Sequence, residues 1–199
     1  MRCFIGVILE IEMDPTDINF QQCAKLLTTC RERNKLPYKT ADIDLINEAI
    51  SKLKLLHIII KQLRYDEEKE RQRTQRNLPI LLTSKVLPEK YFVSIYTRRT
   101  EIYTYSFYYL TFRVYDILKT VTKLGISAPG IVIVRNHLME HPEGKNSRIL
   151  SYGFGHIGPN GPVVKPGRNQ DEKPIHMDKG LYFNAKEFET NLLKSLNRM

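Results

Sequence analysis

The chain has 199 residues, of which 42% are hydrophobic and 27% are charged, as in an ordinary globular protein of one domain or slightly more. This length allows a buried core that needs no disulfide or metal staples. With 31 Lys and Arg residues against 22 Asp and Glu residues, the formal net charge of +9 favours an anionic partner, by default RNA or DNA, over an uninvolved basic surface.

Cysteine usage and hydropathy argue against a secreted or membrane-embedded protein. Cys3, Cys23 and Cys30 are odd in number and contain no Cys-x-x-Cys pair, which indicates a reducing, cytoplasmic setting. The apolar segment Phe4–Leu9 is too short for a targeting core and is followed at once by Glu10. No run approaches the roughly 20 apolar residues of a membrane span, so we expect no membrane partner.

The first helix is predicted between Asp14 and Asn34. Asp14-Pro15-Thr16-Asp17 is a typical helix start, and Pro37 breaks the segment. Apolar residues then follow at helical spacing: Phe20, Cys23, Ala24, Leu26, Leu27 and Cys30. Cys23 and Cys30 lie two turns apart on one face, and we interpret them as small core residues.

The second helix is predicted to begin at a cap provided by Thr40 or Asp42. Its apolar residues recur at steps of three and four, which is typical of a helix that faces a bundle core: Ile43, Ile46, Ile50, Leu53, His57, Ile60 and Leu63. Because His57 lies inside this stripe, we interpret it as a hydrogen-bonded core histidine and not as a ligand.

A charged stretch follows at residues 65–76. It has high helix propensity but no apolar face, which indicates either a solvated helical extension, braced by pairs such as Glu67 with Arg71, or a flexible linker. Its basic end, Arg71, Arg73 and Arg76, is also a candidate contact for phosphate.

A connection is predicted at Leu78–Leu82, and a second long helix from about Glu89 to Leu124. We place on its inner side Phe92, Ile95, Tyr96, Ile102, Tyr103, Tyr109, Leu110, Ile117, Val121 and Leu124. Its aromatic residues surround the helix and do not line one face: Tyr103, Tyr105, Phe107, Tyr108, Tyr109, Phe112 and Tyr115. Some of them must therefore lie at a second interface, formed by another helix or by another copy of the chain.

The composition after Pro142 is rich in glycine, proline and asparagine. Extended stretches are predicted at Ile149–Phe154, Val163-Val164 and Leu181–Phe183. The turn Gly158-Pro159-Asn160-Gly161 favours a small β-hairpin or sheet. Asn184, with Glu187 three residues later, caps a terminal helix that carries Phe188, Leu192 and Leu196.

The predicted fold is therefore mainly α. Residues 1–142 form a bundle of four or five helices, and residues 143–199 add a small β-rich appendage and a terminal helix that pack on the bundle.

A dense cluster of polar side chains follows the apolar run Ile131–Val134, on the last turns of a helix that Pro142 closes: Arg135, Asn136, His137, Glu140 and His141. Arg135 is followed directly by the polar Asn136, and five residues separate Arg135 from His141. This spacing, on a helix after two long helices, resembles the HEPN superfamily of helical ribonucleases and toxin components. The resemblance covers roughly residues 14–142.

The resemblance implies an endoribonuclease that acts as a homodimer and needs no metal or cofactor. Arg135 would clamp a phosphate, His141 would serve as general acid or base, and Asn136 would orient His141 or bind a phosphate oxygen. Arg135 and His141 are about 120° apart around a helix and roughly 9 Å apart along it, so one helix does not aim both at one atom. A two-fold dimer would instead bring two copies of the motif to one cleft.

Further candidates for substrate binding are Arg98, Arg99, Arg113, His137 and Glu140, with RNA as the substrate. A protein antitoxin or regulator is a second partner of the kind that toxin components imply.

Three alternatives to this site stay open. Arg135, Asn136 and Glu140 could form a polar network at a helix end, with His141 capping the last carbonyls. His137 and His141, four residues apart, could hold a metal, although the chain shows no His-Glu-x-x-His order and no obvious third ligand. Finally, the domain could be a non-catalytic module that binds nucleic acid or a protein partner.

Overall fold

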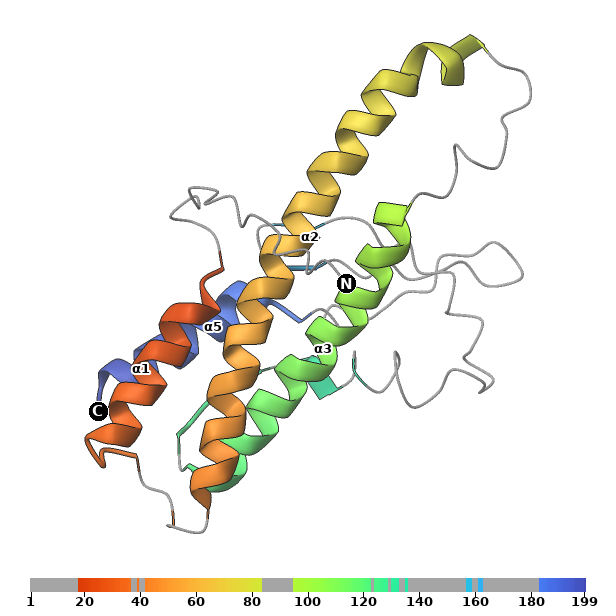
Figure 1. The fold of residues 1–199 in the computed structure, drawn as a ribbon. Helices are drawn as coiled ribbons and strands as arrows, with labels where there is room; N and C mark the ends of the chain where they lie inside the picture. The colour runs from red at the N-terminus through yellow and green to blue at the C-terminus, as the bar shows by residue number, and fades with distance from the viewer. Residues whose placement is uncertain are drawn as a thin grey trace, which may run out of the picture.

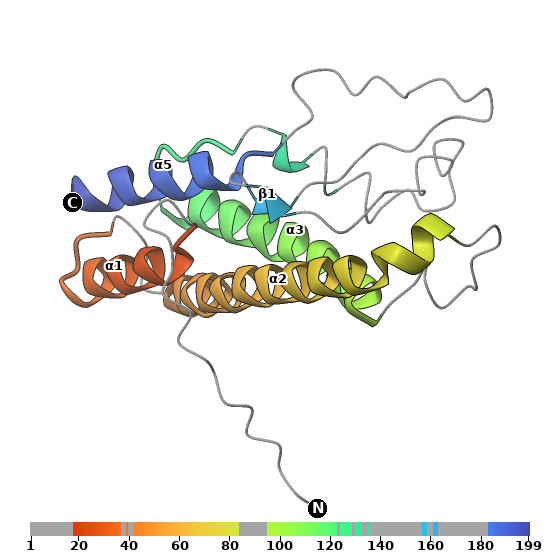
Figure 2. The same cartoon turned by 90° about the horizontal axis from the view of Figure 1, so that it is seen from above.

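The computed structural model describes residues 18–36, 39, 42–83, 95–122, 124–128, 130–132, 135, 157–158, 161–162 and 183–199. Its elements are α1 (Phe20–Glu32), α2 (Ile43–Thr83), α3 (Ile95–Val121), β1 (Ile157–Gly158), β2 (Gly161–Pro162) and α5 (Ala185–Asn197). The long helices α2 and α3 lie side by side, α1 packs on α2, and α5 packs on α1 (Figures 1 and 2). The prediction of a mainly α fold is confirmed.

Helix α1 begins later than the sequence suggested. Its N-cap is Asn19, whose side-chain oxygen accepts the backbone N–H of Gln22 at 3.3 Å, so the start signal at residues 14–17 lies outside both this helix and the described residues. The predicted core face is present: Phe20, Cys23, Ala24, Leu27 and Cys30 are buried. The chain then leaves the helix through Asn34, which has a positive φ of 51°.

Helix α2 carries the predicted core stripe and continues well past it. Buried along its length are Ile46, Ile50, Leu53, His57, Ile60 and Leu63, whereas Ile43, at the first turn, is 40% exposed. The charged stretch is a helical extension that projects beyond α1 (Figure 1), with Arg71 paired to Glu68 and Arg73 to Glu70. The connection predicted at Leu78–Leu82 was wrong, because the helix runs through Pro79 to Thr83.

Two ion pairs hold α3 antiparallel to α2. Arg99 forks onto Asp66 near one end of the contact, and Arg113 donates from Nε to Glu48 Oε1 at 3.1 Å near the other. The predicted inner face of α3 is confirmed in part, since Ile117, Val121 and Leu124 are buried, whereas Ile102 is 62% exposed and Tyr109 is 43% exposed. A helix with aromatic residues all round has no sequence signal that fixes which side faces inward. The predicted helix start near Glu89 lies outside the described residues.

The second aromatic face of α3 is covered by the C-terminal part of the chain. Phe107 and Tyr108 are buried, and Phe183 lies 6.5 Å and 6.2 Å from their ring centroids. Phe20 of α1 and Phe188 of α5 complete this cluster, 6.3 Å from each other. For these buried rings, the second interface is therefore made within the chain.

A short hairpin at the predicted turn and the predicted helix α5 close the bundle. The extended stretches predicted at residues 149–154, 163–164 and 181–182 lie outside the described residues. Strands β1 and β2 pair antiparallel with Gly158 opposite Gly161, and the Tyr108 hydroxyl donates to the Pro162 carbonyl at 2.6 Å. Gly161 has a φ of 113°, and a side chain there would come within 2.7 Å of Ala185 Cβ. Asn184 caps α5 by accepting the backbone N–H of Glu187 at 2.9 Å. The buried face of α5 is the predicted one, with Phe188, Leu192 and Leu196.

Candidate functional site

Arg135 is the part of the motif that the structure describes. It lies in a helical segment with Ile131, which is fully buried, and Val132, which is 43% exposed. The guanidinium carbon of Arg135 lies 4.8 Å from the ring centroid of Phe112, a residue of α3 that packs against the core. A cation held over an aromatic face in this way is attracted by the ring quadrupole. Arg135 is therefore half-buried and held against α3 through Phe112.

The other motif residues fall outside the described part of the chain. These are Asn136, His137, Glu140 and His141, together with the side chain of Arg98. Their positions relative to Arg135 stay predictions from the sequence.

Arg113 and Arg99, both predicted to bind substrate, contact acidic residues of the chain itself. Arg113 follows Phe112 directly but projects toward α2, where it bonds Glu48, and its Nη1 also lies 3.3 Å from Asp116 Oδ2. The hydrogen bond from Arg113 lowers the pKa of Glu48, and Glu48 in turn raises the pKa of Arg113. Arg99 lies 13 residues before Phe112, about 20 Å along the helix. The structure therefore does not gather Arg99, Arg113 and Arg135 at one point.

The ion pair of Arg99 with Asp66 is more buried than the pair of Arg113 with Glu48. The carboxylate of Asp66 is inaccessible to solvent, and it accepts bonds from Arg99 and from Gln62 Nε2 at 3.0 Å. A buried carboxylate needs such partners, because desolvation otherwise penalises its charge. We conclude that Arg99 serves the α2–α3 contact.

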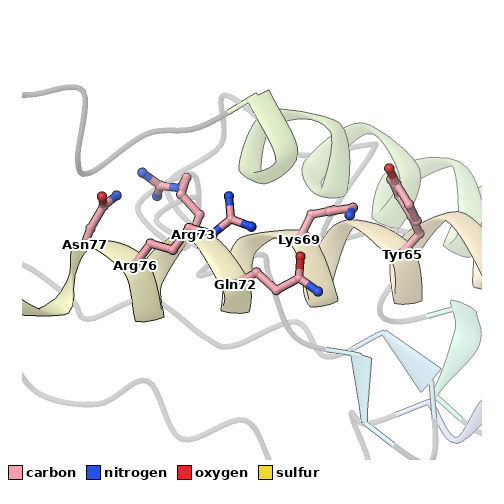
Figure 3. A pocket seen from close by; sticks show the side chains of 6 residues that line it. All are labelled: Tyr65, Lys69, Gln72, Arg73, Arg76 and Asn77. Carbon is pink, nitrogen blue, oxygen red and sulfur yellow. The ribbon is translucent and has the colours of Figure 1, made fainter.

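A basic hollow lies along the projecting part of α2 (Figure 3). It encloses about 570 Å³ and is lined by Tyr65, Lys69, Gln72, Arg73, Arg76 and Asn77. The Lys69 ammonium lies 5.3 Å from the Tyr65 ring centroid. Of the basic residues predicted to contact phosphate here, Arg71 and Arg73 bind Glu68 and Glu70, and Arg76 is exposed at the helix surface.

A second concave surface lies between α1 and α2, and our sequence analysis missed it. One hollow of about 720 Å³ is lined by Gln21, Lys25, Thr28, Thr29, Lys54, His57 and Ile58. An adjoining hollow of about 400 Å³ shares Gln21, Lys25 and His57 and adds Asn19, Gln22 and Lys61. The sequence does contain a signal for this basic surface: neither residues 18–31 nor residues 49–65 contain Asp or Glu. His57 is buried, as predicted for a core histidine, and it also borders this surface.

The described residues contain neither a metal-binding cluster nor a helix that could span a membrane. No group of three or more His, Cys, Asp or Glu residues there could hold a metal ion. His137 and His141 lie outside the described residues. None of the helices described is long and apolar enough to cross a membrane.

Comparison with protein-family models, with curated proteins and with solved structures found no match for this chain. The resemblance to the HEPN superfamily therefore depends on the residues Arg135, Asn136 and His141 and on their place after two long helices.

Proposed function

We propose that this protein is a metal-independent endoribonuclease of the HEPN type that acts as a homodimer. The observation that carries the proposal is the position of Arg135. Phe112 of α3 holds it by a cation–π contact, in a helical segment that follows the long antiparallel pair α2 and α3. Asn136 follows it directly, and His141 comes six positions later. The net charge of +9 supports a polyanionic substrate.

Metal-independent RNA cleavage requires three functions from these side chains. RNA cleavage without a metal needs a group that accepts the 2′-hydroxyl proton, a donor for the leaving 5′-oxygen, and a cation for the charge on the phosphorane-like transition state. Arg135 is the cation in this proposal, and its contact with Phe112 restrains the guanidinium before substrate arrives. His141 transfers protons, and Asn136 orients His141 or binds a phosphate oxygen.

A second copy of the chain completes the cleft. The six-residue separation of Arg135 and His141 points them to different sides of one helix. On α3, Ile102 and Tyr109 are exposed and lie two helical turns apart on one face, which makes an apolar strip available to a partner copy. Val132, beside Arg135, adds exposed apolar surface near the motif.

Cleavage in the presence of a chelator tests this proposal. Purified protein with excess EDTA is incubated with a pool of single-stranded and structured RNA, and the product ends are identified. We expect wild type to leave 2′,3′-cyclic phosphate ends and His141→Ala to lose at least a hundredfold in rate, the typical contribution of a positioned acid–base group. Arg135→Lys should also lose activity, because an ammonium does not reproduce the bidentate fork.

The matched control is Lys194→Ala, which removes one positive charge from the exposed last turn of α5. It should cleave as wild type does. If wild type leaves the RNA intact with EDTA and also with added Mg²⁺, the catalytic proposal is wrong.

A second candidate is a non-catalytic helical module that binds RNA or a protein regulator. The cation–π contact between Arg135 and Phe112 favours it, since an arginine can serve the packing of a helical segment without touching a substrate. Under this alternative, Arg135→Ala lowers the melting temperature, and neither wild type nor variant cleaves RNA.

A further inference from the structure

We propose that one face of α2 is a binding track for the phosphodiester backbone of single-stranded RNA. We call it the α2 track, and it consists of Lys54, Ile58, Lys61, Tyr65, Lys69 and Arg76. The choice of RNA as occupant rests on the proposed function. The track itself rests on the geometry of α2.

The α2 track is continuous because its residues follow helical spacing. Successive members are separated by four, three, four, four and seven residues, which returns each side chain to nearly the same side of the helix. From Lys54 to Arg76 the track spans about 33 Å. Its first half borders the hollow between α1 and α2, and its second half borders the hollow of Figure 3, so the track joins the two concave surfaces.

The cations of the track are available to a ligand. Lys54, Lys61, Lys69 and Arg76 make no ion pair within the described part of the chain, and each is at least partly exposed. Lys25 of α1 faces the same groove and adds a fifth charge. Unneutralised cations in a row attract a polyanion and release its counterions on binding.

The carboxylates near the α2 track are already paired. Glu68 and Glu70 bind Arg71 and Arg73 on the projecting part of α2. At the α1 end of the groove, Glu189 accepts the backbone N–H of Asn19 at 2.6 Å and pairs with Lys186 at 2.7 Å. Because these charges are satisfied, the track keeps its positive potential.

Two apolar side chains between the cations suit nucleic-acid bases. Ile58 is 60% exposed and Tyr65 is 38% exposed, and both lie outside the buried stripe of α2. Single-strand binding sites combine a basic groove, which follows the backbone, with side chains on which bases stack. Because the track alternates cations with exposed apolar side chains, as single-strand binding sites do, we assign single-stranded RNA as its occupant.

The test is equilibrium binding of a fluorescent 12-nucleotide single-stranded RNA to full-length protein. All proteins carry His141→Ala so that cleavage cannot consume the probe, and affinity is measured from 50 to 300 mM salt. Lys54→Gln with Lys61→Gln should weaken binding and reduce the slope of log affinity against log salt by about 1.4, which is 0.7 for each lost phosphate contact. Tyr65→Ala should weaken binding about tenfold with no change of slope.

The matched control is Lys194→Gln with Arg198→Gln, which removes two charges from the end of α5. It should leave both affinity and slope close to those of the parent. Equal melting temperatures of all variants exclude unfolding as the cause of a loss.

Three outcomes would overturn the proposal. The control pair could reduce the slope as much as the track pair does, which would show a response to net charge alone. The Lys54 and Lys61 pair could bind as the parent does. A polyglutamate peptide could displace the RNA at equal charge concentration, which would assign the track to an acidic protein partner.

The outcomes for the track and for the proposed function are separable. If the His141-containing wild type does not cleave RNA but the track variants lose binding, the track stands and the ribonuclease is wrong. If wild type cleaves RNA and the track variants bind normally, the ribonuclease stands and the α2 track is wrong.

Discussion

Cys23 shows how the fold controls a chemically capable side chain. Burial raises the pKa of its thiol, and the nearby charge of Glu189 raises it further. The thiol donates to the Glu189 carbonyl, with sulfur and oxygen 3.9 Å apart. Since the thiolate is the reactive form of cysteine, a raised pKa and a closed environment both suppress its chemistry.

We therefore expect Cys23 to resist alkylation in the native protein. In iodoacetamide at pH 8, peptide mass spectrometry should find Cys23 unmodified on a timescale in which a free thiol peptide reacts completely. The same treatment in 8 M urea should label it. Rapid labelling of native Cys23 would contradict its placement between α1 and α5.

At the scale of elements, α2 and α3 are joined by two arginine pairs that differ in burial. Asp66 is fully buried beneath Arg99, whereas Glu48 and Arg113 are each about one-third exposed. Removing the partner of a buried charge leaves that charge without compensation, while an exposed pair contributes little. The two pairs are thus a matched comparison within one helix–helix contact.

We expect Arg99→Ala to lower the free energy of unfolding by about 2 kcal/mol, below the value for a fully buried pair because Arg99 itself is partly exposed. Arg113→Ala should cost less than about 1 kcal/mol. Urea unfolding measures both. Adding Asp66→Ala to Arg99→Ala should recover part of the loss, and no recovery would mean that Arg99 does not act through Asp66.

Local patterns predicted the elements whose signals lie within one segment. Three features follow from a few neighbouring residues each, and the structure contains them: the cap at Asn184, the buried face of α5 and the turn between Gly158 and Gly161. The burial of Cys23 and Cys30 followed from helical spacing in the same way.

Features that depend on the pairing of distant segments were not predictable. The sequence does not show that Arg99 faces Asp66, 33 residues earlier, so Arg99 was assigned to substrate. Because aromatic residues surround α3, its sequence does not identify the buried side. Ile102 and Tyr109 were therefore placed in the core, although they are exposed. Pro79 suggested a break where α2 continues. Of the predicted catalytic residues, only Arg135 lies within the described chain, so the roles of Asn136 and His141 stay predictions.

At the scale of the whole molecule, the two proposed RNA contacts lie on different helices. Arg135 contacts Phe112 of α3, and the α2 track begins between α1 and α2. The aromatic cluster of Phe20, Phe107 and Phe188 joins α1, α3 and α5 into one core that supports both. A partner copy would then meet the outer strip of α3 at Ile102 and Tyr109 and leave the α2 track open.

The central claim, a cleft built by two copies of the Arg135-to-His141 motif, is tested most directly by mixing two inactive variants. Arg135→Ala and His141→Ala proteins are combined in equal amounts, allowed to exchange subunits, and assayed for RNA cleavage in EDTA. If each Arg135 works with the His141 of the other copy, half of the dimers regain one of their two Arg135–His141 pairs, and the mixture recovers about a quarter of wild-type activity. A mixture that stays as inactive as its two components, while wild type cleaves, would contradict the shared cleft.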